Sequence, residues 1–120
     1  MSDLNKLTIA GARDALAKGE TSAVELTEAC LSAIDASGAL NAFVHNTPEK
    51  AREMAKAADA RLKAGDAAPM TGIPVGVKDL FCVRDVPSQS ASRILEGFVP
   101  QYESTVTQNL WDQGAVLQIG

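Results

Sequence analysis

Among the side chains of this 120-residue sequence, Lys78 is the strongest candidate for a chemical role. It follows an apolar run from Ile73 to Val77 in the stretch TGIPVGVKDL, residues 71–80. We expect this run to form a buried strand, and a lysine at the end of such a strand is partly desolvated, which favours the neutral amine. A neutral amine can accept a proton from a serine hydroxyl, as in hydrolases that pair serine with lysine. Lys78 is therefore a candidate general base if a serine lies within reach.

On spacing alone, a structural role for Lys78 is favoured over a catalytic one. Apolar strands often end in a charged pair at the edge of a sheet, and Asp79 could cap the turn that follows. Pro74 argues against a central strand because proline cannot donate to the ladder. Glycines at positions 72 and 76 favour a functional role instead, since they let a second backbone or a ligand approach closely.

Three helices are predicted before this stretch. The first spans about residues 8–18. The second begins at Ser22, which forms a capping-box pattern with Glu25, and it ends near Gly38. The third spans residues 47–65, with a threonine as its cap and a proline at its first position, where a missing N–H costs nothing.

Two groups of reactive side chains on these helices have a simple structural interpretation. Asp59 and Lys63 lie four residues apart on the polar side of the third helix and are expected to form a solvated face. Cys30 falls on the apolar stripe of the second helix, so we expect it to act as a small hydrophobic residue.

The remaining elements suggest an α/β arrangement. The apolar segment NAFVH at 41–45 is expected to be a short strand, and 84–102 is a long irregular segment of a length typical of functional or mobile loops. Ser104 caps a fourth helix that ends at Gly114, and 115–119 begins another strand. Helix, glycine and strand in this order enter a β–α–β unit, which predicts a parallel or mixed sheet.

Composition excludes several functional classes. The net charge of −4 argues against a surface that grips a phosphate backbone. With a single histidine, His45, and two cysteines outside any ligand spacing, no metal site is expected. Cys30 and Cys82 are interpreted as reduced thiols, and neither a signal peptide nor a membrane-spanning run is visible, so a cytoplasmic location is expected.

Two blocks, GIPVGVKDLFCV at 72–83 and GFVPQYESTVTQNLWDQGAV at 97–116, resemble the amidase-signature enzymes. The parts DLFC and YESTVT, together with the N-terminal segment 7–35, are most similar to the A subunits of aspartyl/glutamyl-tRNA(Asn/Gln) amidotransferases. The chain looks like the N-terminal fragment of such a protein. The resemblance implies an α/β fold with a mixed sheet flanked by helices, incomplete here: a helical part at 1–65, the catalytic-lysine strand and loop at 71–102, and a helix and strand at 103–120.

The resemblance also implies a Ser–cis-Ser–Lys triad whose lysine corresponds to Lys78. The lysine would deprotonate the bridging serine, which relays to the serine that attacks the amide carbon of glutamine. An acyl-enzyme would form, ammonia would leave, and water would regenerate the enzyme. Ammonia would pass to a B subunit, where ATP and Mg²⁺ activate the glutamate or aspartate misacylated onto tRNA, and a small C subunit would complete a heterotrimer. No cofactor is expected in this chain itself.

The sequence departs from the family pattern in three places. Both serines of the implied triad lie in a downstream Gly/Ser-rich segment that this sequence lacks, and Ser88, Ser90 and Ser92 are expected to be ordinary loop residues. Asp85 stands where relatives usually carry glycine. After GAV, relatives have two residues and then Gly-Lys, whereas here three residues precede Gly120. We therefore expect a truncated reading frame whose product is inactive alone.

Two other functions remain open. The lysine block is common to all amidase-signature enzymes, so the chain could belong to a hydrolase of small or fatty amides. It could also be a non-catalytic interaction module whose helices dock onto a partner subunit or onto the missing half of the fold.

Overall fold

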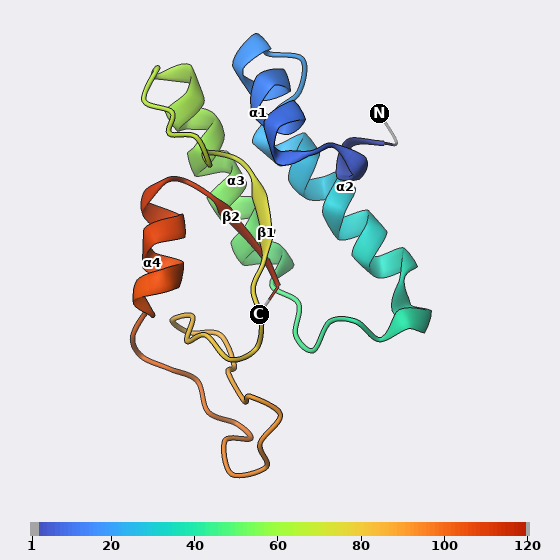
Figure 1. Ribbon diagram of the computed structural model, residues 1–120, viewed down its shortest axis with the longest axis vertical. Coiled ribbons are helices and arrows are strands. Elements are labelled where there is room, and N and C mark those ends of the chain that lie inside the picture. Colours follow the sequence, from blue (N-terminus) through green and yellow to red (C-terminus); the bar gives the residue numbers. More distant parts are fainter. Residues whose placement is uncertain (1–2, 120) are drawn as a thin grey trace.

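The computed structural model describes residues 3–119, and Figure 1 shows their arrangement. The elements in chain order are η1 (Leu4–Lys6), α1 (Ile9–Lys18), α2 (Ala23–Ala36), η2 (Gly38–Leu40), α3 (Pro48–Lys63), β1 (Pro74–Gly76), α4 (Thr105–Asp112) and β2 (Val116–Ile119). Within the described part of the chain, every helix is too short or too polar to traverse a bilayer.

Capping by local side chains sets the starts of three α-helices, and the sequence predicts two of these caps, Ser22 and Ser104. The Thr8 hydroxyl accepts the N–H of Gly11 at the start of α1, at 3.0 Å. Ser22 accepts the N–H of Glu25 at the start of α2, at 3.1 Å. The capping box itself is incomplete, because the Glu25 carboxylate accepts from the Thr21 hydroxyl at 3.0 Å. Ser104 caps α4 in the predicted way.

The start of α3 differs from the predicted cap. A proline occupies the first position as expected, but Thr47 makes no side-chain cap bond. Its ψ of 59° departs from the extended conformation of the residues that cap α1, α2 and α4, so its hydroxyl is not directed at the free N–H groups of the helix. Within residues 3–119 this buried hydroxyl has no hydrogen-bond partner.

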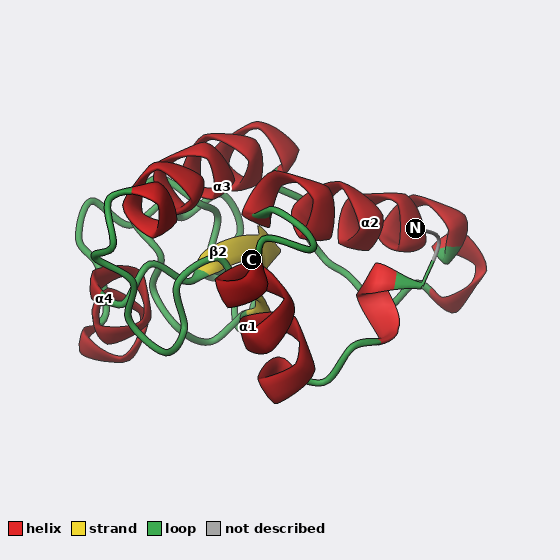
Figure 2. Ribbon diagram, turned by 90° about the horizontal axis from the view of Figure 1, so that it is seen from above, coloured by secondary structure: helices red, strands yellow, loops and turns green. Residues whose placement is uncertain are grey.

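The two strands pair in parallel, with Pro74 opposite Val116. The Val116 N–H donates to the carbonyl of Ile73 at 2.9 Å, and the Gly72 N–H donates to the carbonyl of Gly114 at 2.9 Å. Figure 2 shows α2 and α3 on one side of the strand pair and α1 on the other. The α/β class is therefore confirmed, as is the parallel pairing expected from the order of helix, glycine and strand.

Small side chains let α2 and α3 approach β2 closely. One buried cluster consists of Ala23, Ala51, Ala55, Ala58 and Val116. Alanine brings little volume and loses no rotamer freedom on burial, so the two helices pack tightly at little entropic cost.

Larger side chains fill the space at both ends of the strand pair. Leu16 of α1 and Leu26 of α2 pack with Ile73 just before β1. Beyond β1, Val83 and Val86 pack against Leu117 of β2 and are almost completely buried. The loop that follows β1 is thus anchored to the sheet by its own apolar residues.

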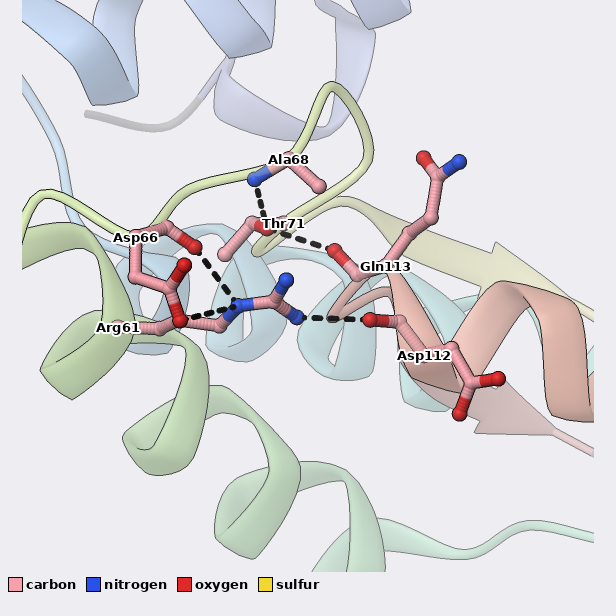
Figure 3. Close-up of polar contacts among 6 residues, drawn as sticks. All are labelled: Arg61, Asp66, Ala68, Thr71, Asp112 and Gln113. Atoms are coloured by element: carbon pink, nitrogen blue, oxygen red, sulfur yellow. Dashed lines mark hydrogen bonds and ion pairs between the residues drawn. The ribbon is translucent and has the colours of Figure 1, made fainter.

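A polar junction fixes the chain just before β1, as Figure 3 shows. The Arg61 guanidinium donates to the carbonyl of Asp66 at 2.8 Å and to that of Asp112, the last residue of α4, at 3.0 Å. The Thr71 hydroxyl donates to the carbonyl of Gln113 at 2.6 Å. These bonds join the end of α3 and the linker before β1 to the C-terminus of α4, whose last carbonyls need such donors.

Gly114 permits this junction. Its φ is +85°, and a Cβ at this position would lie 3.0 Å from both Arg61 Nη1 and Thr71 Oγ1. Only glycine combines that backbone conformation with such a close approach.

The prediction of a strand at 41–45 is wrong. Asn41 adopts a left-handed φ of 47°, and Val44 is 71% exposed. A strand needs a neighbour that pairs its main-chain groups, and within residues 3–119 the sheet consists of β1 and β2. Phe43 and Val44 instead line a hollow together with residues 76–79.

Asp59 is a helix cap, and the prediction of a merely solvated position is wrong. Its two carboxylate oxygens accept the N–H groups of Ala23 and Val24, at 2.7 and 3.1 Å. These are free donors at the N-terminus of α2, where a negative charge is also favourable. The four-residue spacing from Asp59 to Lys63 describes α3 alone, whereas the hydrogen-bond partners of Asp59 belong to α2.

We expect Asp59→Ala to lower the free energy of unfolding by roughly 1–2 kcal/mol, because two helix N–H groups lose their acceptors. Asp59→Asn keeps an acceptor oxygen and should lose less. Urea denaturation of the three proteins measures the difference, with Lys63→Ala as the control on the same helix. An equal loss of stability in Lys63→Ala and Asp59→Ala would contradict the capping role.

Candidate functional site

Lys78 lies just beyond β1, at the carboxyl end of the parallel strand pair. This edge is where open α/β sheets usually place their ligands. The strand ends at Gly76, earlier than the apolar run suggests, and the Lys78 side chain is exposed. The expected partial desolvation is therefore not provided by the described residues, because Lys78 lies on a loop and no element covers it.

Two hollows flank Lys78. The first, of about 360 Å³, is lined by residues 42–44 and 76–79. The second, of about 380 Å³, is lined by Val44, Lys78, Asp79, Leu80 and residues 89–91. Lys78 thus borders free volume on two sides, large enough for a small organic group or a segment of polypeptide.

The three loop serines have different environments. Ser88 is buried, and its hydroxyl donates to the carbonyls of Phe81 and Val86 at 3.3 and 3.4 Å. Ser92 accepts the N–H of Ile94, at 3.2 Å. The exposed Ser90 alone of the three borders a hollow together with Lys78. Ser88 and Ser92 are thus engaged in local structure, in keeping with their interpretation as loop residues.

Asp79 makes two contacts that sequence reasoning missed. Its Oδ1 accepts the N–H of Gln89 at 3.0 Å, and its carbonyl accepts the N–H of Ser90 at 2.9 Å. The sequence suggested a cap for the immediately following turn, but the partners lie ten residues further on. Within the sequence, the only indication is the polar segment PSQS at 87–90, which does not identify a partner.

The two blocks that carry the family resemblance contact each other. The Cys82 carbonyl accepts from the Ser104 N–H at 2.9 Å and from the Thr107 hydroxyl at 3.3 Å. The Cys82 thiol lies 3.5 Å from the Tyr102 hydroxyl. This hydrogen bond, followed by the charge of the thiolate, raises the pKa of Tyr102. The start of α4 is therefore held directly against the loop that follows Lys78.

Asp85 occupies a glycine-like conformation. Its φ is 63°, and its N–H donates to the carbonyl of Pro100 at 3.0 Å. The turn thus has the left-handed backbone conformation that glycine adopts freely, and aspartate tolerates this conformation less well than glycine does.

Cys30 is half-buried on α2 and borders a pocket of about 370 Å³ between that helix, Phe43 and β1. Burial raises the pKa of its thiol. In residues 3–119 no three His, Cys, Asp or Glu side chains gather in a way that could hold a metal ion.

Comparisons with known proteins agree on one family. The sequence model of the family described as Amidase matches residues 25–118. The chain is 69% identical over 118 residues to the A subunit of the glutamyl-tRNA(Gln) amidotransferase of Ruegeria pomeroyi, and the match covers 98% of this chain and 24% of that protein. The chain thus spans about a quarter of the length of this relative.

Solved structures give the same result. The peptide amidase of Stenotrophomonas maltophilia superposes with a TM-score of 0.89 at 26% identity, over 98% of this chain and 25% of that chain. A second match is a chain from a vestigial protein complex, which bears on the origins of an s-triazine catabolic enzyme. It superposes with a TM-score of 0.88 at 33% identity, over 93% of this chain and 25% of that chain.

Asp85→Gly should raise the free energy of unfolding by about 0.5–1 kcal/mol, because relief of the left-handed backbone outweighs the added freedom of the unfolded chain. Asp85→Val should lower it, since a β-branched residue is the least tolerant of positive φ. Urea midpoints of the three proteins test this order. A glycine variant less stable than the parent would contradict it.

Alkylation of Cys30 should have a pH–rate midpoint above that of the same thiol in the unfolded chain. A raised pKa leaves less thiolate at any given pH, and the thiolate is the nucleophile. The measurement uses iodoacetamide on the Cys82→Ser variant, folded and in urea. Coincident midpoints would contradict the effect of burial.

Proposed function

The chain belongs to the amidase-signature family, and from this premise we propose that it supplies the general base, Lys78, to the glutamine-hydrolysing site of the A subunit of a tRNA-dependent amidotransferase. The observation that carries the proposal is the place of Lys78, at the carboxyl end of β1 and bordered by two hollows. The choice of this kind of amidase rests on the similarity to the Ruegeria pomeroyi protein.

In this proposal the amine of Lys78 takes a proton from a bridging serine, which in turn takes one from the nucleophilic serine. That serine attacks the amide carbon of glutamine and forms an acyl-enzyme, and the proton held by Lys78 returns through the bridging serine to the leaving nitrogen, which departs as ammonia. Water then releases glutamate. Neither serine is assigned to a residue of this chain, so both would come from the part of an amidase domain that lies outside the matched quarter of its relatives.

The environment of Lys78 supports a site completed by a further segment. Apolar side chains around the two hollows are exposed: Phe43 by 42%, Val44 by 71% and Leu80 by 49%. A segment packed against them would remove water from the amine and favour its neutral form, which is the form a general base needs. The 120-residue chain alone is then expected to hydrolyse no glutamine.

The wider assignment follows from the similarity to the Ruegeria pomeroyi protein. Ammonia would pass to a B subunit that uses ATP and Mg²⁺, a C subunit would join the complex, and misacylated tRNA would be the final acceptor. The two free thiols, Cys30 and Cys82, suit the reducing conditions of the cytoplasm.

Two other candidates are kept. A hydrolase of other amides is favoured by the likeness to a peptide amidase. A non-catalytic interaction module is favoured by the exposed apolar residues around Lys78, which would then serve docking alone.

The test is a fusion of this chain to the region of the Ruegeria pomeroyi relative that follows the matched quarter. The fusion should release ammonia from glutamine, and Lys78→Ala should reduce the rate by roughly 10²- to 10⁴-fold, because the general base is lost. Lys63→Ala, an exposed lysine on α3, is the control and should keep full activity.

The outcomes separate the candidates. Full activity in the Lys78→Ala fusion would rule out the proposed role of that residue. Hydrolysis of peptide or fatty amides in place of glutamine would favour the second candidate. A folded fusion that turns over no amide would favour the interaction module.

A further inference from the structure

The contacts of Asp79 join two of the segments that line the second hollow beside Lys78. Its carboxylate accepts the Gln89 N–H and its carbonyl accepts the Ser90 N–H, at 3.0 and 2.9 Å. The residues that flank Asp79 in the chain are also bonded to one another: the Lys78 carbonyl accepts the N–H groups of Leu80 and Phe81, at 2.7 and 3.2 Å. The main chain around Asp79 is therefore fixed in both directions, and Asp79 is half-buried.

The segment that Asp79 holds is a turn in an unfavourable conformation. The Ser92 N–H donates to the Gln89 carbonyl at 2.9 Å, which closes a four-residue turn. Its central residues, Ser90 and Ala91, have φ values of 52° and 55°. Two central residues with positive φ are typical of a type I′ turn, for which asparagine and glycine are the usual choices. Serine and alanine hold this conformation only if the surroundings impose it.

The same two residues form one wall of the hollow. Ser90 and Ala91 line it together with Val44, Lys78 and Asp79. If the turn relaxed toward negative φ, this wall would move. The position of the wall relative to the amine therefore depends on the two bonds to Asp79.

From this geometry we propose that Asp79 is a positioning residue, which holds the Gln89–Ser92 turn as a wall of the hollow beside Lys78. Its consequence for catalysis rests on the proposed function, in which the amine must meet a serine hydroxyl within that space. Asp79 does not touch the reacting atoms and acts through the turn.

The acceptor oxygen of Asp79 matters here more than its charge. The ion pairs that the structure records within residues 3–119 join other side chains, and the carboxylate contact of Asp79 is to a main-chain N–H. An asparagine can present the same carbonyl-type oxygen to Gln89. The proposal therefore predicts that Asp79→Asn behaves as the parent and Asp79→Ala does not.

The first test measures hydrogen exchange of the Gln89 and Ser90 amides in the 120-residue chain. Asp79→Ala should speed both by about tenfold or more, Gln89 because its acceptor is gone and Ser90 because the turn relaxes. Asp79→Asn should stay within about threefold of the parent. Ala91→Gly in the Asp79→Ala background should restore protection at Ser90, since glycine takes positive φ freely. Asp35→Ala, on the exposed surface of α2, is the control.

The second test uses the glutamine-hydrolysing fusion and normalises the rate to folded enzyme. Asp79→Ala should reduce kcat by roughly 10- to 100-fold, because misplacement of the catalytic environment acts on the chemical step. Asp79→Asn should keep kcat within about threefold of the parent. A purely structural role would lower Tm and leave kcat per folded molecule unchanged.

Unchanged exchange at both amides in Asp79→Ala, or no protection of them in the parent, would overturn the proposal. Faster exchange with an unchanged kcat would also overturn it, since the turn would then not serve the site. An inactive parent fusion would reject the proposed function instead, and the exchange rates would still decide whether Asp79 holds the turn.

Discussion

The close approach of the chain before β1 to the chain after α4 is the constraint on which the rest of the structure depends. Gly114 makes it possible, because any side chain there would meet Arg61 and Thr71 at 3.0 Å. Thr71 and Arg61 in turn satisfy the last carbonyls of α4. This junction places Ile73 and Val116 within hydrogen-bond distance and so starts the parallel pair. The direction of β1, and with it the position of Lys78, follows from that start.

Local signals in the sequence predicted local structure well. Ser22 and Ser104 cap helices because their partners lie three residues away, and the helix before Gly114 leads into a parallel strand as its order suggests. Thr47 is a local exception, because its hydroxyl makes no cap bond at the start of α3. The other failures concern distant partners. Asp59 caps a different helix, and the segment 41–45 has strand-like composition but no neighbouring strand among the described residues. Periodicity and spacing carry no information about such contacts.

At the candidate site too, the sequence predicts local features and misses those that depend on distant contacts. Lys78 could be singled out from its sequence block, and the structure places it just beyond β1, while its catalytic role stays a prediction. Its exposure could not be foreseen, because burial depends on what covers the strand and not on the apolar run itself. The turn at Ser90 and Ala91 gave no signal either, since neither residue is typical of positive φ. Both features depend on tertiary contacts around one loop.

The parallel pairing of β1 with β2 also has a consequence for the order of folding. The helices α2 and α3 are neighbours along the chain and share an alanine-rich interface, so they can dock after closing a short loop. Pro74 and Val116 are separated by the long loop and all of α4, and closing that loop costs more chain entropy before any strand contact forms. Because non-local contacts slow folding, the strand pair should form late in the folding reaction, on a helical pair that is already in place.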